Sequence, residues 1–185
     1  MSECQNCKVR LTEPSDPIEM RPDPEKGTFW PDCIGCGGGI MGLYVSKRVK
    51  EAFDVALVTY GKTFQAIVER PYPKRLKEPE APLYFYVTGE FGAKLDFQGS
   101  GYGIKSICPT CGHVKTDPAS TPSKYQLIEG SWNGADIFYT DLSRTTIFCS
   151  ERILELARSH RWTNFRFVPI EEGHNYAHRG VDYLS

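Results

Sequence analysis

The sequence predicts an α+β protein made of two similar halves, each running strand, strand, helix, strand. Two observations predict this fold class. A Cys-x-x-Cys phrase begins at Cys4 and returns at Cys108, both times followed by Thr, an acidic residue and Pro. The segments 44–53 (YVSKRVKEAF) and 148–157 (FCSERILELA) stand at the same offset and share Ser, Arg and Glu at matching positions. Several matches at one fixed spacing indicate an internal repeat.

The length, hydrophobic content and charge balance of the chain limit the class of protein to which it can belong. A chain of 185 residues makes one domain or two small ones, and 40% hydrophobic content is enough for a core. Lys plus Arg total 22 against 23 for Asp plus Glu, so nucleic acid is not the expected partner. No apolar run approaches the roughly 18 residues that span a bilayer, and no signal peptide is visible. We therefore expect a cytoplasmic protein with no membrane partner.

Each half contains one amphipathic helix that begins after a serine. Ser46 and Ser150 stand at N-cap positions, where a hydroxyl can accept hydrogen bonds from free amides of the first turn. The apolar residues that share one helical face are Val49, Ala52 and Phe53 in the first half and Ile153, Leu156 and Ala157 in the second.

Strands are predicted on both sides of each helix. An aromatic strand precedes each helix, at Phe29 and Trp30 in the first half and at 136–139 (DIFY) in the second. An extended segment follows each helix, at 63–69 (TFQAIVE) and at 164–170 (NFRFVPI).

The region between the halves has a composition of its own. Residues 69–82 are rich in Pro and charge and predict an exposed linker, whereas 83–91 (LYFYVTGEF) predicts a strand. The chain thus divides into a first repeat unit at 1–70 with the N-terminal Cys knuckle, a linker and connecting strand at 71–103, and a second repeat unit at 104–185. The second unit carries the second Cys knuckle and a C-terminal tail.

Six of the seven cysteines form three Cys-x-x-Cys pairs, Cys4/Cys7, Cys33/Cys36 and Cys108/Cys111. In a reducing compartment such pairs are more often metal ligands than disulfides, because two intervening residues let both sulfurs point at one ion. A Cys4 site needs two of the three pairs. The first two pairs are nearest to zinc-ribbon spacing, whereas the last two both carry a following Gly. The first and third pairs are the equivalent knuckles of the two halves.

Symmetry favours the pairing of equivalent knuckles, with Cys4, Cys7, Cys108 and Cys111 as ligands of one Zn²⁺. The two halves would then be joined around a Cys4 zinc-ribbon-like site. A closed Cys4 shell leaves no open coordination position, so this zinc would be structural. Cys33 and Cys36 could replace Cys4 and Cys7, form a second metal site, act as a redox dithiol, or remain a reduced pair in a loop. Cys149 is expected to be a small core residue.

Other residue patterns do not support an enzyme. His113 follows the second knuckle and could substitute for a thiolate, and His160 stands at a helix C-terminus, where a cation is favourable. His174 and His178 lie in a tail without helical periodicity. Asp136 flanks an aromatic strand without a defined catalytic geometry. The chain has no phosphate loop, no dinucleotide-binding glycine fingerprint and no nucleophile elbow.

The cysteine motifs, together with residues 134–172, resemble the bacterial double-CXXCG motif family, which is zinc-binding and immunity-protein-like. The second motif of the family matches Cys108 to Gly112. The C-terminal signature matches Asp136-Ile-Phe, Ser150-Glu-Arg and the segment from Phe165 to Pro169. The first motif departs from the family, because Lys8 stands where Gly is expected. The resemblance covers the C-terminal third well and the remainder only through the order of elements.

The resemblance implies zinc binding and toxin neutralisation, and it implies no catalytic residues. The sequence therefore predicts a non-enzymatic zinc-binding protein that acts by protein–protein binding, as an immunity protein against a cognate bacterial protein toxin. One alternative is a zinc-ribbon adaptor associated with nucleic acid. The other is a dithiol oxidoreductase that uses Cys33 and Cys36.

Overall fold

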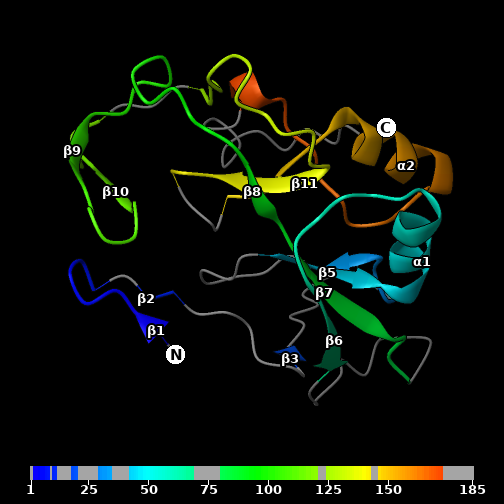
Figure 1. The fold of residues 1–185 in the computed structure, drawn as a ribbon. Coiled ribbons are helices and arrows are strands. Elements are labelled where there is room, and N and C mark those ends of the chain that lie inside the picture. The colour runs from blue at the N-terminus through cyan, green and yellow to red at the C-terminus, as the bar shows by residue number, and fades with distance from the viewer. Residues whose placement is uncertain are drawn as a thin grey trace.

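The protein is a mixed α+β molecule with two helices and several small sheets, as seen in a computed structural model (Figure 1). The structure describes residues 2–8, 10–11, 18–20, 29–34, 42–68, 80–120, 124–142 and 146–172. The predicted fold class, α+β, is confirmed. Most of the predicted linker and of the C-terminal tail, together with Cys36, His174 and His178, lies outside the described residues.

The strands form four sheets. Their bounds are β1 Ser2–Glu3, β2 Arg10–Leu11, β3 Ile18–Met20, β4 Cys33–Ile34, β5 Gly42–Ser46, β6 Thr63–Val68, β7 Tyr84–Thr88, β8 Glu90–Ala93, β9 Ile104–Ile107, β10 Val114–Thr116, β11 Ile137–Thr140 and β12 Phe148–Cys149. The largest sheet has the order β3-β6-β7-β5-β4, and a second has the order β12-β11-β8. The pairs β1-β2 and β9-β10 are separate two-stranded hairpins.

Both predicted helices are confirmed, as α1 (Lys47–Val55) and α2 (Glu151–His160). Ser46 caps α1 as expected, because its hydroxyl accepts from the amide of Val49. Ser150 occupies the N-cap position of α2 but makes no side-chain cap bond. Its hydroxyl donates instead to a carboxylate oxygen of Asp136 at 2.6 Å. The serine in the second half therefore bonds to a carboxylate rather than to its own helix.

The strand predictions at 63–69, 83–91 and 136–139 are confirmed by β6, by β7 with β8, and by β11. The strand predicted at Phe29 and Trp30 is wrong. Pro31 follows directly and cannot donate to a ladder, and the chain enters the sheet only at β4. The Trp30 ring packs against Tyr84 instead, with ring centroids 6.3 Å apart.

The strand predicted at 164–170 is also wrong. Its counterpart β6 lies between β7 and β3, whereas the β12-β11-β8 sheet offers no neighbouring strand to 164–170 among the residues that the structure describes. The chain here is irregular, and the rings of Phe165 and Phe167 stack with centroids 5.8 Å apart. Packing of these rings replaces a strand ladder in this half.

The central strand of the large sheet comes from the region between the two halves. β7 lies between β6 and β5, and Gly89 alone separates it from β8, which pairs with β11 in parallel. The chain therefore passes from one sheet to the other within a single residue, and this crossing links the two halves directly.

The ladders of the two halves repeat at a fixed spacing. In the first half Cys33 pairs with Val45, and in the second Ile137 pairs with Cys149. In the hairpins, Glu3 opposite Arg10 is matched by Ile107 opposite Val114. Each second pair lies 104 residues beyond the first, which is the spacing that also separates Cys4 from Cys108.

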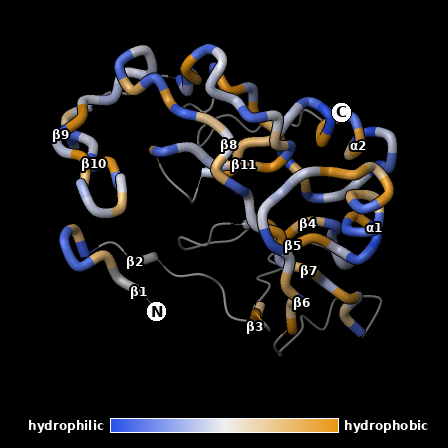
Figure 2. The backbone as a smooth tube through the Cα atoms, viewed as in Figure 1, coloured by the Kyte–Doolittle hydropathy of each residue, from blue (hydrophilic) through white to orange (hydrophobic). Residues whose placement is uncertain are grey.

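The main core lies between the two helices and the large sheet, and both halves contribute to it. Successive residues of a strand face opposite sides of the sheet, so the side chains of β5 and β7 fall into two groups. Val45 and Val87 face the helices, whereas Tyr44, Tyr84 and Tyr86 form a second apolar cluster on the other side of the sheet. Figure 2 shows the strands of this sheet as largely hydrophobic. The main core contains Cys33, Val45, Val49, Phe53, Val58, Val87, Ile137, Ile153, Ala157, Trp162 and Phe165.

Candidate metal centre

Each Cys-x-x-Cys phrase forms a tight turn that folds back on itself. The amide of Lys8 donates to the carbonyl of Cys4 at 2.9 Å, and the amide of Gly112 donates to that of Cys108 at the same distance. Lys8 and Gly112 both have left-handed backbone conformations, with φ of 60° and 70°. Glycine adopts this conformation without strain, whereas lysine does not. The first knuckle therefore forms its turn despite the residue at this position.

Two short hairpins hold the knuckles. The knuckle of Cys4 and Cys7 lies between β1 and β2, and that of Cys108 and Cys111 lies between β9 and β10. In the second hairpin, the amide of Cys108 also donates to the carbonyl of His113 at 2.9 Å. The two hairpins lie next to each other and to one side of the helices and the larger sheets (Figure 1). This arrangement brings the start and the middle of the chain together.

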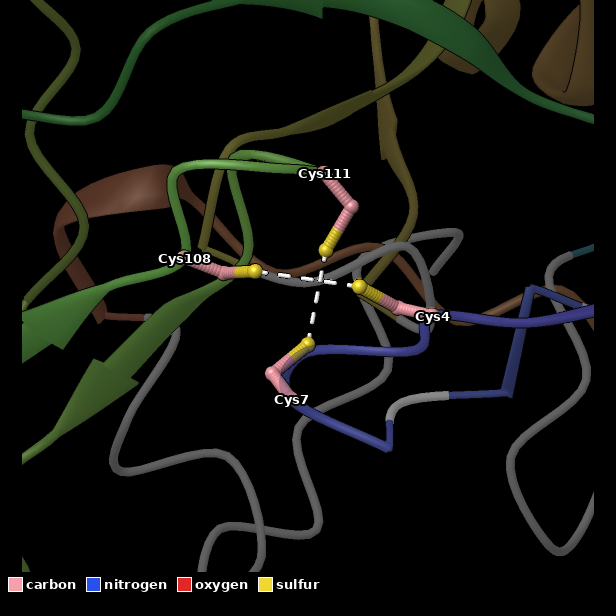
Figure 3. A group of neighbouring side chains, drawn as sticks. All are labelled: Cys4, Cys7, Cys108 and Cys111. Atoms are coloured by element: carbon pink, nitrogen blue, oxygen red, sulfur yellow. Dashed lines mark hydrogen bonds between the residues drawn. The ribbon is translucent and has the colours of Figure 1, made fainter.

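The four sulfurs of these knuckles meet at one point. The Sγ atoms of Cys4 and Cys108 are 3.7 Å apart, those of Cys7 and Cys111 are 3.4 Å apart, and all four lie within 4.8 Å of one another. Figure 3 shows the side chains from the two knuckles pointing toward this common centre. Zinc–sulfur bonds of about 2.3 Å in a tetrahedron require sulfurs about 3.8 Å apart. The donor set and its spacing therefore fit a single thiolate-bound metal ion.

Backbone amides prepare the site for negative charge. Hydrogen bonds from the amides of Cys7 and Asn6 lower the pKa of the Cys4 thiol. Those from Cys111 and Thr110 lower the pKa of Cys108 to about 6. At Cys111 the amide of His113 acts in the same direction, but desolvation and the three neighbouring thiols outweigh it and raise its pKa. Four thiolates this close repel one another, and a bound cation offsets that repulsion.

Burial differs within the cluster. Cys4 and Cys108 are buried, whereas Cys7 and Cys111 are half-buried. The site thus lies near the surface, with one sulfur of each knuckle turned inward. All four predicted ligands are brought together, and the two knuckles that supply them are 104 residues apart in the sequence.

The remaining predicted candidates lie elsewhere. Cys33 is 5% exposed and belongs to the main core with Val45. Cys149 is exposed as a residue and belongs to none of the described apolar clusters, so the prediction that it is a core residue is wrong, although local burial of its thiol raises its pKa to about 12. Its counterpart Val45 is covered because β5 lies between β4 and β7, whereas β12 has β11 as its partner strand. The His160 ring stacks on Trp162 at the end of α2, with centroids 5.6 Å apart.

Three polar residues that the sequence analysis missed connect the two halves. Asp32 accepts hydrogen bonds from Thr163, and Asp136 accepts them from Thr59. The signal was present in the sequence, because Asp32 and Thr59 stand opposite Asp136 and Thr163 at the offset that relates the knuckles.

These observations define a mixed α+β protein in which four of the seven cysteines are positioned to bind one metal ion. A scan against protein-family models gave no match, and a search of curated proteins gave none either. Within the described ranges, neither helix has both the length and the apolar character needed to cross a membrane.

Proposed function

We propose that this protein binds one zinc ion through Cys4, Cys7, Cys108 and Cys111, and that the ion fastens the two hairpins together. The observation that carries the proposal is the convergence of four sulfurs within 4.8 Å from two distant parts of the chain. Zinc suits this donor set because structural zinc sites are tetrahedral and rich in thiolate. When bound, the zinc ion supplies positive charge that offsets the repulsion among the four thiolates.

A site of this kind stabilises the fold and does not react with a substrate. Four protein thiolates complete a tetrahedral shell, so no position remains for water or substrate. We therefore propose a non-enzymatic role. The two knuckles make the backbone turn, and their amides favour the thiolate forms of Cys4 and Cys108. Zinc binding then joins two hairpins that are distant in the sequence.

We further propose that the two halves are copies of one ancestral unit. The proposal is supported by two matched ladders, since the β1-β2 and β4-β5 pairs recur 104 residues later in β9-β10 and β11-β12. It is supported also by the left-handed residues Leu57 and Arg161, which end α1 and α2 at equivalent positions. In such a pair, the metal joins equivalent knuckles.

The proposed biological role is protein binding, as an immunity protein that occludes a cognate bacterial toxin. The resemblance of the C-terminal third supports the immunity role. Two exposed aromatic side chains support protein binding, because protein interfaces use such anchors. They contact different residues of β11, Trp132 packing against Phe138 and Phe91 against Tyr139. Trp132 and Phe91 are 50% and 47% exposed. Asn133, next to Trp132, bonds to the carbonyls of Phe91 and Gly92, so the loop that presents Trp132 is fixed to β8.

Elemental analysis of the reduced protein tests the metal assignment. We expect one zinc per chain in the wild type and almost none in the Cys108→Ser/Cys111→Ser variant, because two thiolates cannot hold the ion. Cys149→Ser is the matched control and should keep one zinc per chain. Full zinc retention after the loss of Cys108 and Cys111 would overturn the assignment.

Co-expression tests the immunity role separately. The probe is the toxin encoded beside this gene, produced in a sensitive bacterium. We expect wild-type protein to restore growth and to form a complex with the toxin. Trp132→Ala should weaken that complex while leaving zinc content unchanged. A gene neighbourhood without a toxin, or toxicity that persists despite production of this protein, contradicts the role and leaves the metal site standing.

A further inference from the structure

The first of two matching polar clusters is centred on Asp32. Its carboxylate accepts hydrogen bonds from the hydroxyl of Ser46 at 3.0 Å and from the guanidinium of Arg48, whose Nε lies at 3.1 Å. It also accepts from Thr163, from the amide at 2.9 Å and the hydroxyl at 3.1 Å. The Asp32 residue is 7% exposed, so these donors replace water around a buried charge.

The second cluster is centred on Asp136 and repeats the first. Its carboxylate accepts from the hydroxyl of Ser150 at 2.6 Å and from Nη1 of Arg152 at 3.3 Å. It accepts from the amide and the hydroxyl of Thr59, at 3.0 and 3.3 Å. Asp136 is 6% exposed. The same three residue types, Ser, Arg and Thr, donate to both carboxylates.

The clusters are completed across the halves, not within them. Ser46 and Arg48 come from the same half as Asp32, but Thr163 follows α2 in the other half. The amide of Asp32 donates in return to the hydroxyl of Thr163 at 3.0 Å, and the amide of Asp136 donates to that of Thr59 at 2.8 Å. Each half supplies one carboxylate and one threonine.

The arginines of the two clusters also contact the opposite half in a reciprocal way. Arg48 donates to the carbonyl of His160 at the end of α2, at 3.3 Å, and Arg152 donates to the carbonyl of Ala56 at the end of α1. Each arginine thus reaches the C-terminus of the helix of the other half, where free carbonyls favour a cation. Contacts in which i meets j while the equivalent of j meets the equivalent of i are the mark of a two-fold interface.

We infer that the two carboxylate clusters, Asp32 with Thr163 and Asp136 with Thr59, are reciprocal clamps that make the two halves one cooperative folding unit. Each clamp closes only when both halves are folded and docked. Replacing the charged carboxylate by a neutral amide weakens the hydrogen bonds that it accepts from the amide and the hydroxyl of the threonine of the other half. Damage in one half therefore loosens the segment after the helix of the other half. This inference concerns hydrogen bonds and does not require a bound metal.

Hydrogen exchange in the full chain tests the reciprocity. In Asp32→Asn we expect amides at 161–165, in the opposite half, to exchange at least tenfold faster in mild denaturant. In Asp136→Asn we expect the same at 56–60. Glu51→Gln is the control, since Glu51 is an exposed carboxylate that pairs with Lys47 within α1. It should change neither segment.

A second pair of variants covers the case in which an aspartate variant does not fold. Thr163→Val removes the hydroxyl and should speed exchange around residues 31–33, whereas Thr163→Ser keeps both donors and should restore wild-type exchange. Faster exchange confined to the mutated half would overturn the inference. So would equal effects of Thr163→Val and Thr163→Ser. Running each variant with and without zinc keeps this result separate from the metal assignment.

Discussion

The hairpins that carry the cysteines and the body that carries the helices join the same two halves by different means. In the body, the joint is an apolar core and two polar clamps. Among the side chains that the structure describes, none of the three apolar clusters includes one from β9 or β10, although Val114 of β10 is buried. The hairpins are joined by converging sulfurs. A small element without a core of its own depends on a metal or a disulfide for its order.

The body shows complementary packing between the halves. Phe53 in α1 and Trp162 after α2 are both buried and meet edge to face, with centroids 5.5 Å apart. At the equivalent positions stand Ala157 and Val58, so each half offers one large and one small side chain to the joint. The two halves can therefore fill one core without being identical.

The largest expected effect is that of removing the metal, because structural zinc binding contributes on the order of 10 kcal/mol in small zinc modules. A strong zinc chelator under reducing conditions should raise hydrogen exchange in β9 and β10 by orders of magnitude. Amides of α1 and α2 should keep their protection, since the body has its own core. Equal loss of protection in hairpins and helices would show that the two regions are not held independently.

A core substitution should produce the reverse pattern. Phe53→Ala removes a fully buried ring from the joint and should lower the free energy of unfolding by about 3–5 kcal/mol. Zinc content at low temperature should stay at the wild-type value, because no hairpin contact is touched. Val55→Ala, on the same helix at 87% exposure, is the matched control and should change stability little. Chemical denaturation followed by circular dichroism measures both.

Local patterns in the sequence predicted both helices, several strands and the four cysteines of the metal site. Serine caps and apolar periodicity located α1 and α2, and β-branched and aromatic content located β6, β7 and β11. The equal offset of the cysteine pairs selected the four residues whose sulfurs now lie together. These features depend on near neighbours in the chain or on direct repetition.

Features that depend on distant neighbours were not predictable in the same way. The segment 164–170 has strand-like composition, yet no strand lies beside it within the described part of the chain. Cys149 has the pattern of a core residue, yet β12 has no counterpart of β7 to cover it. The clamps at Asp32 and Asp136 required knowing that each half completes the other, and composition does not carry that information.

Lowering the pH is expected to have a smaller effect on the stability of the fold. Burial alone would raise the pKa of Asp32, but hydrogen bonds from Arg48, Thr163 and Ser46 outweigh it and lower the pKa below 3.8. The pKa of Asp136 is lowered in the same way by Ser150 and its other donors. A lowered pKa in the folded state contributes stability that is present above the unfolded value and is lost as the pH falls through the folded value.

Urea denaturation of the zinc-free, reduced protein between pH 6 and pH 3 measures this contribution. Wild-type stability should fall more steeply below about pH 4 than that of the Asp32→Asn/Asp136→Asn variant, because unfolded aspartate titrates near 3.9. Other carboxylates are present in both proteins, so their effects cancel in the difference. If the stabilities of the two proteins fall in parallel as the pH is lowered, the clamps do not contribute to the loss of stability in acid.

The smallest expected effect lies within the hairpins, where the two knuckles differ by one residue. Lys8 holds a left-handed conformation that costs a non-glycine residue about 1 kcal/mol, whereas Gly112 holds the equivalent position without strain. Lys8→Gly should therefore strengthen zinc binding up to about fivefold in competition with a chromogenic chelator. Gly112→Ala should weaken it to a similar degree. No atom lies within 4 Å of a Cβ built at Gly112, so the cause would be backbone strain rather than a clash. If both substitutions leave the affinity unchanged, turn conformation does not limit how the knuckles present their sulfurs.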